Sequence, residues 1–192
     1  MIRALYDWTI SLAGHPRALW ALAVVAFVES SVFPIPPDVL MIPMIIAAPS
    51  RAFLIAGVAL IASVAGGILG YGIGAFAFEQ VGRPVLAGLG KAEAMDAFND
   101  RFNDFGFWPV LIAGLTPFPY KVITIMSGWT GLPFATFVVA SVVARGLRFF
   151  VVAWLLWRFG APIRDFIERR LGLMFTLFVA ILLGGFLMVR WL

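Results

Sequence analysis

The sequence predicts an all-α polytopic membrane protein, an inverted repeat of a re-entrant hairpin plus a transmembrane helix, with an amphipathic interfacial helix between the halves. Hydrophobic residues make up 62% of the 192 residues and charged residues only 12%, whereas a soluble domain carries about 25% charged residues. Two proline-rich apolar segments occupy matching places in the two halves. These observations together favour one helical membrane domain over residues 1–192.

Three apolar stretches are long enough to cross a membrane, for which about 20 residues suffice. Residues 52–78 and 171–189 carry no formal charge, and residues 134–157 contain two arginines. We expect each stretch to be a transmembrane helix.

The two proline-rich segments are apolar but unsuited to a continuous helix. Residues 30–49 contain five prolines and residues 107–128 contain three, and proline removes a helix hydrogen bond and clashes with the preceding turn. Broken backbone at membrane depth is tolerated only where protein or water lines it. The sequence therefore predicts re-entrant hairpins around a cavity, broken at Pro34, Pro36, Pro117 and Pro119.

The two hairpin segments resemble each other. Residues 34–39 align with residues 117–122 at an offset of 83 residues, and the same offset carries 52–78 onto 135–161. The common order of a Pro-x-Pro segment and a long apolar run indicates a duplication.

The distribution of Lys and Arg sets the expected orientation, since these residues concentrate on the cytoplasmic side. Residues 158–170 contain four arginines, so we place them and Arg51 in the cytoplasm. The first hairpin then opens inward and the second outward, as in an inverted repeat.

The connector between the halves has helical spacing of apolar residues. Met95, Phe98, Phe102 and Phe105 recur on one face of residues 91–105, with acids and amides opposite, which is typical of a helix lying in the membrane interface. The expected parts are an N-terminal helical region (1–30), a first repeat (31–78), the connector (79–106), a second repeat (107–160) and a C-terminal transmembrane helix (171–190).

Five ionisable residues fall inside apolar sequence: Glu29, Asp38, Lys121, Arg145 and Arg148. A charge at mid-bilayer costs about 2.5–3.5 kcal/mol on insertion scales, so such residues face a polar interior and pair. Both acids come from the first half and all three bases from the second, which suits pairing across the repeat interface. Structural ion pairs alone, or Glu29 and Lys121 side chains that extend to the membrane interface, would also explain this pattern.

The three bases are candidate substrate-binding residues. Arg145 and Arg148 are three residues apart and share a helix face, where two guanidinium groups offer bidentate donors to a phosphate or carboxylate. Lys121 adds a cation beside the second hairpin break. We expect Arg145 and Arg148 to act as one anion site, and Asp38 and Lys121 to meet where the hairpin tips face each other.

Glu29 and Asp38 are candidates for proton carriers or gating residues, because burial and nearby cations shift a carboxyl pKa in opposite directions. Gly66, Gly70 and Gly74 recur every fourth residue, which favours close helix packing.

An enzyme is not expected. Cysteine is absent and the one histidine, His15, lies near the start of the chain, so a membrane serine protease or lipid phosphatase would lack its histidine in the bundle. Of the two aspartates that an intramembrane aspartyl protease needs, only Asp38 is available. We expect no metal, no cofactor and, with a net charge of +4, no nucleic-acid partner.

The chain resembles the DedA family of membrane proteins, also called the SNARE-associated or VTT domain group, and most resembles its YqaA-like branch. The resemblance covers about residues 26–160 and rests on Glu29 followed by 33–38, then residues 66–74, 115–121 and 145–149. It implies two facing re-entrant hairpins, a role in moving or scrambling lipids, and a link to undecaprenyl phosphate recycling, membrane homeostasis and proton-dependent transport. By similarity, Glu29 and Asp38 match the family's acidic positions near the first hairpin.

One departure bears on the lipid. Lys121 stands where many members carry an arginine, and a second hairpin arginine of the larger branch is missing. Lysine and arginine are not equivalent at a bidentate phosphate site.

The expected function is transport, flipping or scrambling of an anionic lipid in the bacterial inner membrane, with protons as a candidate coupling ion and a homo-oligomer permitted. Two alternatives are a proton-coupled carrier of a small cation or drug, with Glu29 and Asp38 as the binding residues, and a non-transporting scaffold that packs through the glycine face.

Overall fold

The structure, a computed structural model, describes residues 17–32, 36–77, 79–80, 84, 88, 92–116, 119–160 and 162. Every regular element of this part of the chain is a helix, so the all-α expectation is confirmed there. Pro34, Pro117, the 1–16 region and the expected 171–190 helix lie outside the described residues.

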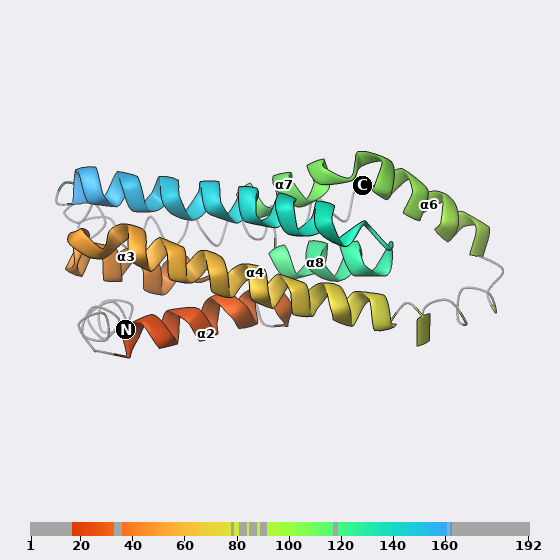
Figure 1. Cartoon of the computed structure of the whole chain (residues 1–192), viewed down its shortest axis with the longest axis horizontal. Coiled ribbons are helices and arrows are strands. Elements are labelled where there is room, and N and C mark those ends of the chain that lie inside the picture. Colours follow the sequence, from red (N-terminus) through yellow and green to blue (C-terminus); the bar gives the residue numbers. More distant parts are fainter. Residues whose placement is uncertain are drawn as a thin grey trace.

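Two long apolar helices form the axis of the molecule (Figure 1). Helix α4 (Ala52–Ala77) follows a 3₁₀ turn, η1 (Pro49–Arg51), and together they span 29 residues. The second is the 27-residue helix Phe134–Gly160. By length and composition each can cross a membrane, for which about 20 residues suffice.

Aromatic contacts show that these two helices are antiparallel. Phe53, near the start of α4, lies 6.4 Å between ring centroids from Phe150 and 5.9 Å from Trp157. Tyr71, near the end of α4, lies 5.5 Å from Phe134. The start of each helix therefore lies beside the end of the other.

Two pairs of short helices pack against this axis from opposite ends (Figure 1). The first pair is α2 (Ala18–Ser31) and α3 (Asp38–Ala47), and the second is α7 (Phe107–Leu115) and α8 (Tyr120–Trp129). With 9 to 14 residues each, they are too short to span a bilayer at 1.5 Å per residue. The breaks fall at the prolines: α3 begins after Pro37 and α8 after Pro119.

Each pair has its own apolar cluster. The first cluster joins α2, α3, the start of α4 and the end of the Phe134–Gly160 helix, with Leu22, Met41, Ile45 and Phe149 at its centre. The second joins α7, α8 and the start of the Phe134–Gly160 helix, with Val110, Tyr120 and Phe137 fully buried. The apolar core is thus divided into two parts along the length of the molecule.

Close helix packing around α4 depends on glycine. A Cβ at Gly66 would clash with the backbone of Phe27 in α2, and one at Gly74 would clash with the Ile125 carbonyl in α8. Gly70 lies between them, against Thr124. The glycine face of α4 therefore contacts both helix pairs at backbone distance, where a side chain would hold them apart.

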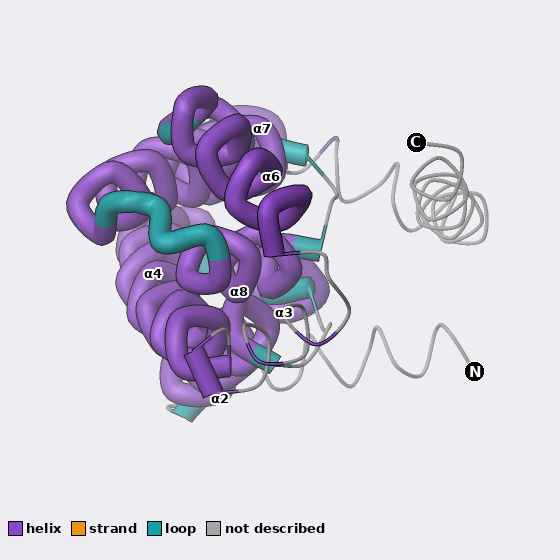
Figure 2. Tube along the Cα trace, turned by 90° about the vertical axis from the view of Figure 1, so that its right-hand side faces the viewer, coloured by secondary structure: helices purple, strands orange, loops and turns teal. Residues whose placement is uncertain are grey.

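The connector helix α6 (Ala92–Phe105) docks on the second pair. Phe102 is buried in the second cluster, and the Asn103 amide donates to the Thr130 carbonyl at 2.8 Å, just after α8. Asp100 and Asp104 are exposed. Helix α6 lies at one end of the long axis (Figure 1), and in the view along that axis α6 and α7 lie on the side opposite α2 (Figure 2).

Candidate functional site

A polar layer separates the two apolar clusters. Ser63 and Arg145, which come from the two long helices, lie eleven residues after Ala52 and Phe134, near the middle of each helix. We call this group the central polar layer; its members are Glu29, Ser30, Asp38, Ser63, Tyr120, Lys121, Thr124, Ser141, Arg145 and Arg148.

Arg145 and Glu29 form the buried ion pair of the layer. The Arg145 Nη2 to Glu29 Oε2 distance is 2.5 Å, and the Arg145 Nε donates to the Ser63 hydroxyl at 2.7 Å. The Arg145 side chain is 2% exposed and that of Glu29 11%. The guanidinium carbon also lies 4.7 Å from the Tyr120 ring centroid and 4.8 Å from that of Phe149, a cation–π arrangement.

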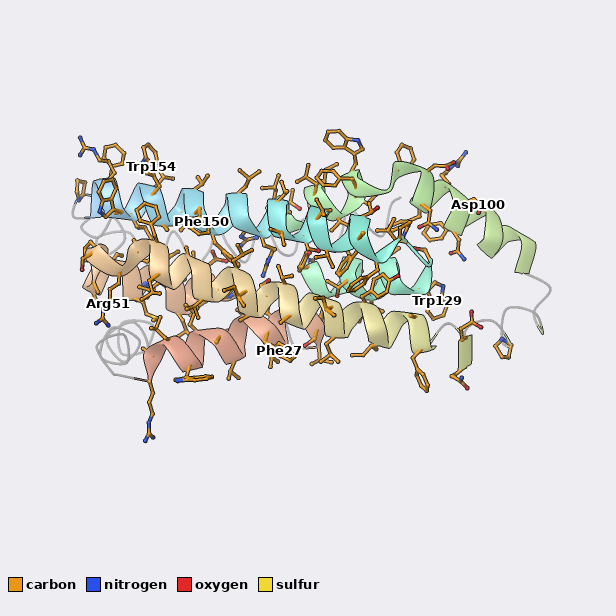
Figure 3. The ribbon with its side chains drawn as sticks, in the orientation of Figure 1. Phe27, Arg51, Asp100, Trp129, Phe150 and Trp154 are labelled. Carbon is orange, nitrogen blue, oxygen red and sulfur yellow. The ribbon has the colours of Figure 1, made fainter. Side chains whose placement is uncertain are left out.

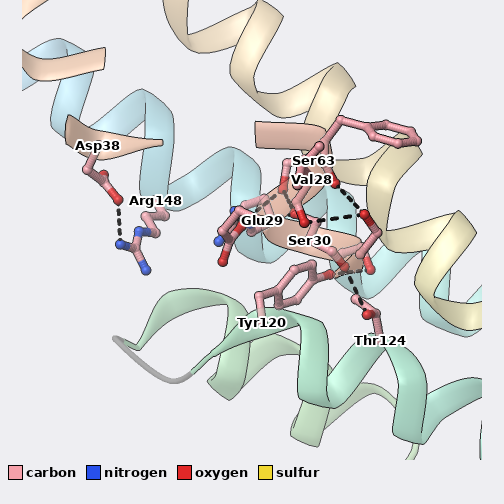
Figure 4. A network of polar contacts seen from close by, with 12 residues as sticks. Val28, Glu29, Ser30, Asp38, Ser63, Tyr120, Thr124 and Arg148 are labelled. Carbon is pink, nitrogen blue, oxygen red and sulfur yellow. Dashed lines mark hydrogen bonds and ion pairs between the residues drawn. The ribbon is translucent and has the colours of Figure 1, made fainter. Parts of the chain in front are cut away.

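Hydroxyl groups extend this pair into a network (Figure 4). The Ser30 and Ser63 hydroxyls are 2.7 Å apart, and the Thr124 hydroxyl donates to the Ser30 carbonyl at 3.0 Å. The Tyr120 hydroxyl donates to Ser141 at 2.5 Å. The network thus connects α2, α4, α8 and the Phe134–Gly160 helix.

Arg148 and Asp38 form a second and more accessible ion pair. Arg148 Nη2 lies 2.7 Å from Asp38 Oδ2, and the two side chains are 23% and 19% exposed. The same guanidinium donates from Nη1 to the carbonyl oxygen of Thr116 at 3.0 Å. Thr116 is the residue at which α7 ends, so Arg148 bridges the first and second helix pairs.

The expected meeting of Asp38 and Lys121 is wrong. Asp38 pairs with Arg148, and the Lys121 ammonium donates to the carbonyl oxygen of Val32 at 3.2 Å, where α2 ends. The helix pairs do approach each other here, but the contact joins a side chain to a backbone carbonyl. A carbonyl at a helix end has no intrahelical donor and attracts a cation.

The structure separates the two arginines that share a helix face. Arg145 is buried and binds Glu29 and Ser63, whereas the Arg148 side chain is partly exposed. Lys121 is half-buried and forms no ion pair with another described residue. With three cations against two acids, the central polar layer has an excess of one positive charge.

The sequence analysis missed the hydroxyl residues of the layer. Ser63 could have been recognised, because it and Tyr71 are the only polar side chains in the 26 residues of α4. Of the two break prolines that the structure describes, Pro36 lies two residues before the start of α3 and Pro119 immediately before α8. In the described part of the chain, no group of three His, Asp or Glu side chains could hold a metal ion.

Comparison with known proteins places this arrangement in a family. A family model described as the VTT domain matches residues 35–158, which include most of the central polar layer. An uncharacterized protein of Haemophilus influenzae is 39% identical over 168 residues, covering 85% of this chain and 87% of that protein. An uncharacterized protein of Histophilus somni is 38% identical over the same extent. No solved structure matches significantly.

Proposed function

The chain belongs to the VTT domain family, the DedA membrane proteins, and from this premise we propose that it transports, flips or scrambles an anionic, phosphate-bearing lipid such as undecaprenyl phosphate. The family is not known for enzymatic activity. The proposed location is the bacterial inner membrane, which the chain crosses several times.

In this proposal the helix pairs α2–α3 and α7–α8 are re-entrant hairpins that enter from opposite faces of the membrane. Two apolar helices of spanning length and the approach of the pairs from opposite ends support it (Figure 1). Arg51 and Trp154 lie at one end of the molecule and Asp100 and Trp129 at the other (Figure 3). The arginine end is assigned to the cytoplasm because Lys and Arg concentrate there.

The observation that carries the proposal is the excess positive charge of the central polar layer, together with where it is accessible. The Arg148 side chain is partly exposed, and Lys121 faces a carbonyl oxygen without a carboxylate partner among the described residues. An anionic head group would supply the missing negative charge at membrane depth, where an unbalanced charge is expensive. A phosphate fits because its oxygens accept charge-assisted hydrogen bonds from guanidinium and ammonium groups.

In this scheme Arg145 stabilises the fold and does not bind the lipid, because its donors already bind Glu29 and Ser63. Asp38 remains the counter-ion on Nη2 of Arg148, and a head group would take the Nη1 donor that now binds the Thr116 carbonyl.

The alternatives fit the contacts less well. A carrier of small cations needs acidic side chains free to bind them, but Glu29 and Asp38 are each occupied by an arginine. A scaffold that packs through the glycine face needs that face free, but Gly66 and Gly74 already contact α2 and α8.

The test is native mass spectrometry of the protein released from nanodiscs that contain phosphatidylcholine and a polyprenyl monophosphate. Wild-type protein should retain the monophosphate lipid, and Arg148→Lys should retain severalfold less, because an ammonium cannot reproduce the planar fork. Arg158→Lys, at the exposed end of the same helix, is the matched control and should retain as much as wild type. Equal retention by all three proteins would contradict the assignment of Arg148.

A further inference from the structure

The two accessible cations of the central polar layer bind the ends of helices. Lys121, in the first turn of α8, donates to the Val32 carbonyl, where α2 ends. Arg148 donates to the Thr116 carbonyl, where α7 ends. In each helix pair, therefore, the first helix ends on a carbonyl that accepts a hydrogen bond from a cation.

These contacts also tie the two pairs to each other. We call the described residues that flank the breaks the first tip (Val32 and 36–38) and the second tip (Thr116 and 119–121). Lys121 of the second tip binds Val32 of the first, and Arg148 bridges Asp38 of the first and Thr116 of the second. Two cations thus hold the tips together.

We propose that these two cations form a latch that a phosphate head group opens. This inference rests on the proposed function and adds how ligand binding is coupled to movement. A phosphate that takes donors from Lys121 and Arg148 removes them from the Val32 and Thr116 carbonyls. Helix-end carbonyls that lose these donors at membrane depth need water as a new hydrogen-bond donor. The bound lipid therefore shifts the conformational population of the protein toward a state in which the tips are separated and hydrated.

The buried hydrogen-bond network indicates which parts of the protein stay in place when the tips separate. Glu29, Ser63 and Arg145 interact away from the tips, and the glycine contacts of α4 hold α2 and α8 at backbone distance. The movement is therefore expected at the tips. Ser30 joins the fixed and the moving part, because its hydroxyl bonds Ser63 and its carbonyl accepts from Thr124 of the second pair.

The experiment measures maleimide labelling of single cysteines, which the cysteine-free chain permits. The reporter is Ser30→Cys, whose position is fully buried beside the first tip. The control is Ser127→Cys, equally buried in α8, where the hydroxyl bonds only within its own helix, to Ile123. Both proteins are compared in phosphatidylcholine nanodiscs with and without phosphatidic acid as the phosphate-headed probe.

Phosphatidic acid should raise the labelling rate at position 30 severalfold and leave position 127 unchanged. Adding Lys121→Met to the reporter should raise the rate without phosphatidic acid and reduce the further increase. Hydrogen exchange of residues 119–124 in the unmodified chain gives the same comparison if the Ser30→Cys protein folds poorly.

Native mass spectrometry of the same nanodiscs distinguishes failure of the latch from failure of phosphate binding. Retention of phosphatidic acid with no rise in labelling or exchange would overturn the latch and leave lipid binding intact. Failure to retain phosphatidic acid would overturn phosphate binding at this site, and with it the opening of the latch by a ligand. In that case the labelling rate of the Lys121→Met protein alone decides whether the cation holds the tips together.

Discussion

Neutralising Glu29 should destabilise the protein more than neutralising Asp38, although both acids pair with an arginine. Glu29→Gln keeps the shape of the side chain and removes its charge, which leaves Arg145 without a counter-ion at 2% exposure. Asp38→Asn does the same to Arg148, which is 23% exposed. The comparison isolates the effect of burial on one kind of ion pair.

The magnitudes follow from those exposures. Removing one partner of a buried ion pair costs about 3–5 kcal/mol, because the remaining charge is desolvated and unpaired. A pair whose side chains are partly exposed contributes about 1 kcal/mol or less. We therefore expect Glu29→Gln to lower the free energy of unfolding by about 3 kcal/mol or more, and Asp38→Asn by about 1 kcal/mol.

The assay is equilibrium unfolding by SDS in mixed micelles for the four members of the double-mutant cycle Glu29→Gln and Arg145→Gln. The double variant has no stranded charge, so it should be more stable than the sum of the single losses implies, by a coupling of about 2–3 kcal/mol. The same cycle for Asp38→Asn and Arg148→Gln is the control and should show a smaller coupling. Additive losses in the first cycle, or equal couplings in both, would refute the reasoning.

Two further predictions test the packing and the orientation. Gly74→Ala should lower the free energy of unfolding in SDS by about 1–3 kcal/mol through overpacking against the Ile125 carbonyl. Gly72→Ala is the control: its new methyl group meets nothing within 4 Å, so the free energy of unfolding should stay unchanged or rise. Single cysteines at Ser50 and Pro133, both exposed and at opposite ends of the long helices, should react with an impermeant maleimide from opposite sides of the membrane; reaction from one side would contradict the inverted arrangement.

The helices could be predicted because hydrophobicity and proline determine them locally. The expected helix over 52–78 is observed as Ala52–Ala77, and the connector helix over 91–105 as Ala92–Phe105. The helix expected over 134–157 continues to Gly160. The expected helix ends at Trp157 because the charge of Arg158 ends the apolar run, but arginine has a good helix propensity and the backbone continues through it.

The charged residues of the site could also be predicted, since an ionisable side chain inside apolar sequence needs a partner. The ion pairs do join acids of the first half to bases of the second. The partner of each acid could not be predicted from the sequence. It depends on the position of each helix pair along the two long helices. That position is set by the glycine contacts of α4, and spacing along the chain does not encode it.

The error over Lys121 has a more general cause. A sequence offers a lysine only side-chain partners, and Asp38 is the acid at the matching position of the other tip. A helix that ends inside a membrane protein creates acceptors of its own, because its last carbonyls lack intrahelical donors and carry the negative end of the helix dipole. Lys121 binds such a carbonyl at Val32, and Arg148 binds another at Thr116. Because broken helices are what distinguish these two segments, cations placed next to the breaks are expected to bind the backbone first and a ligand in competition with it.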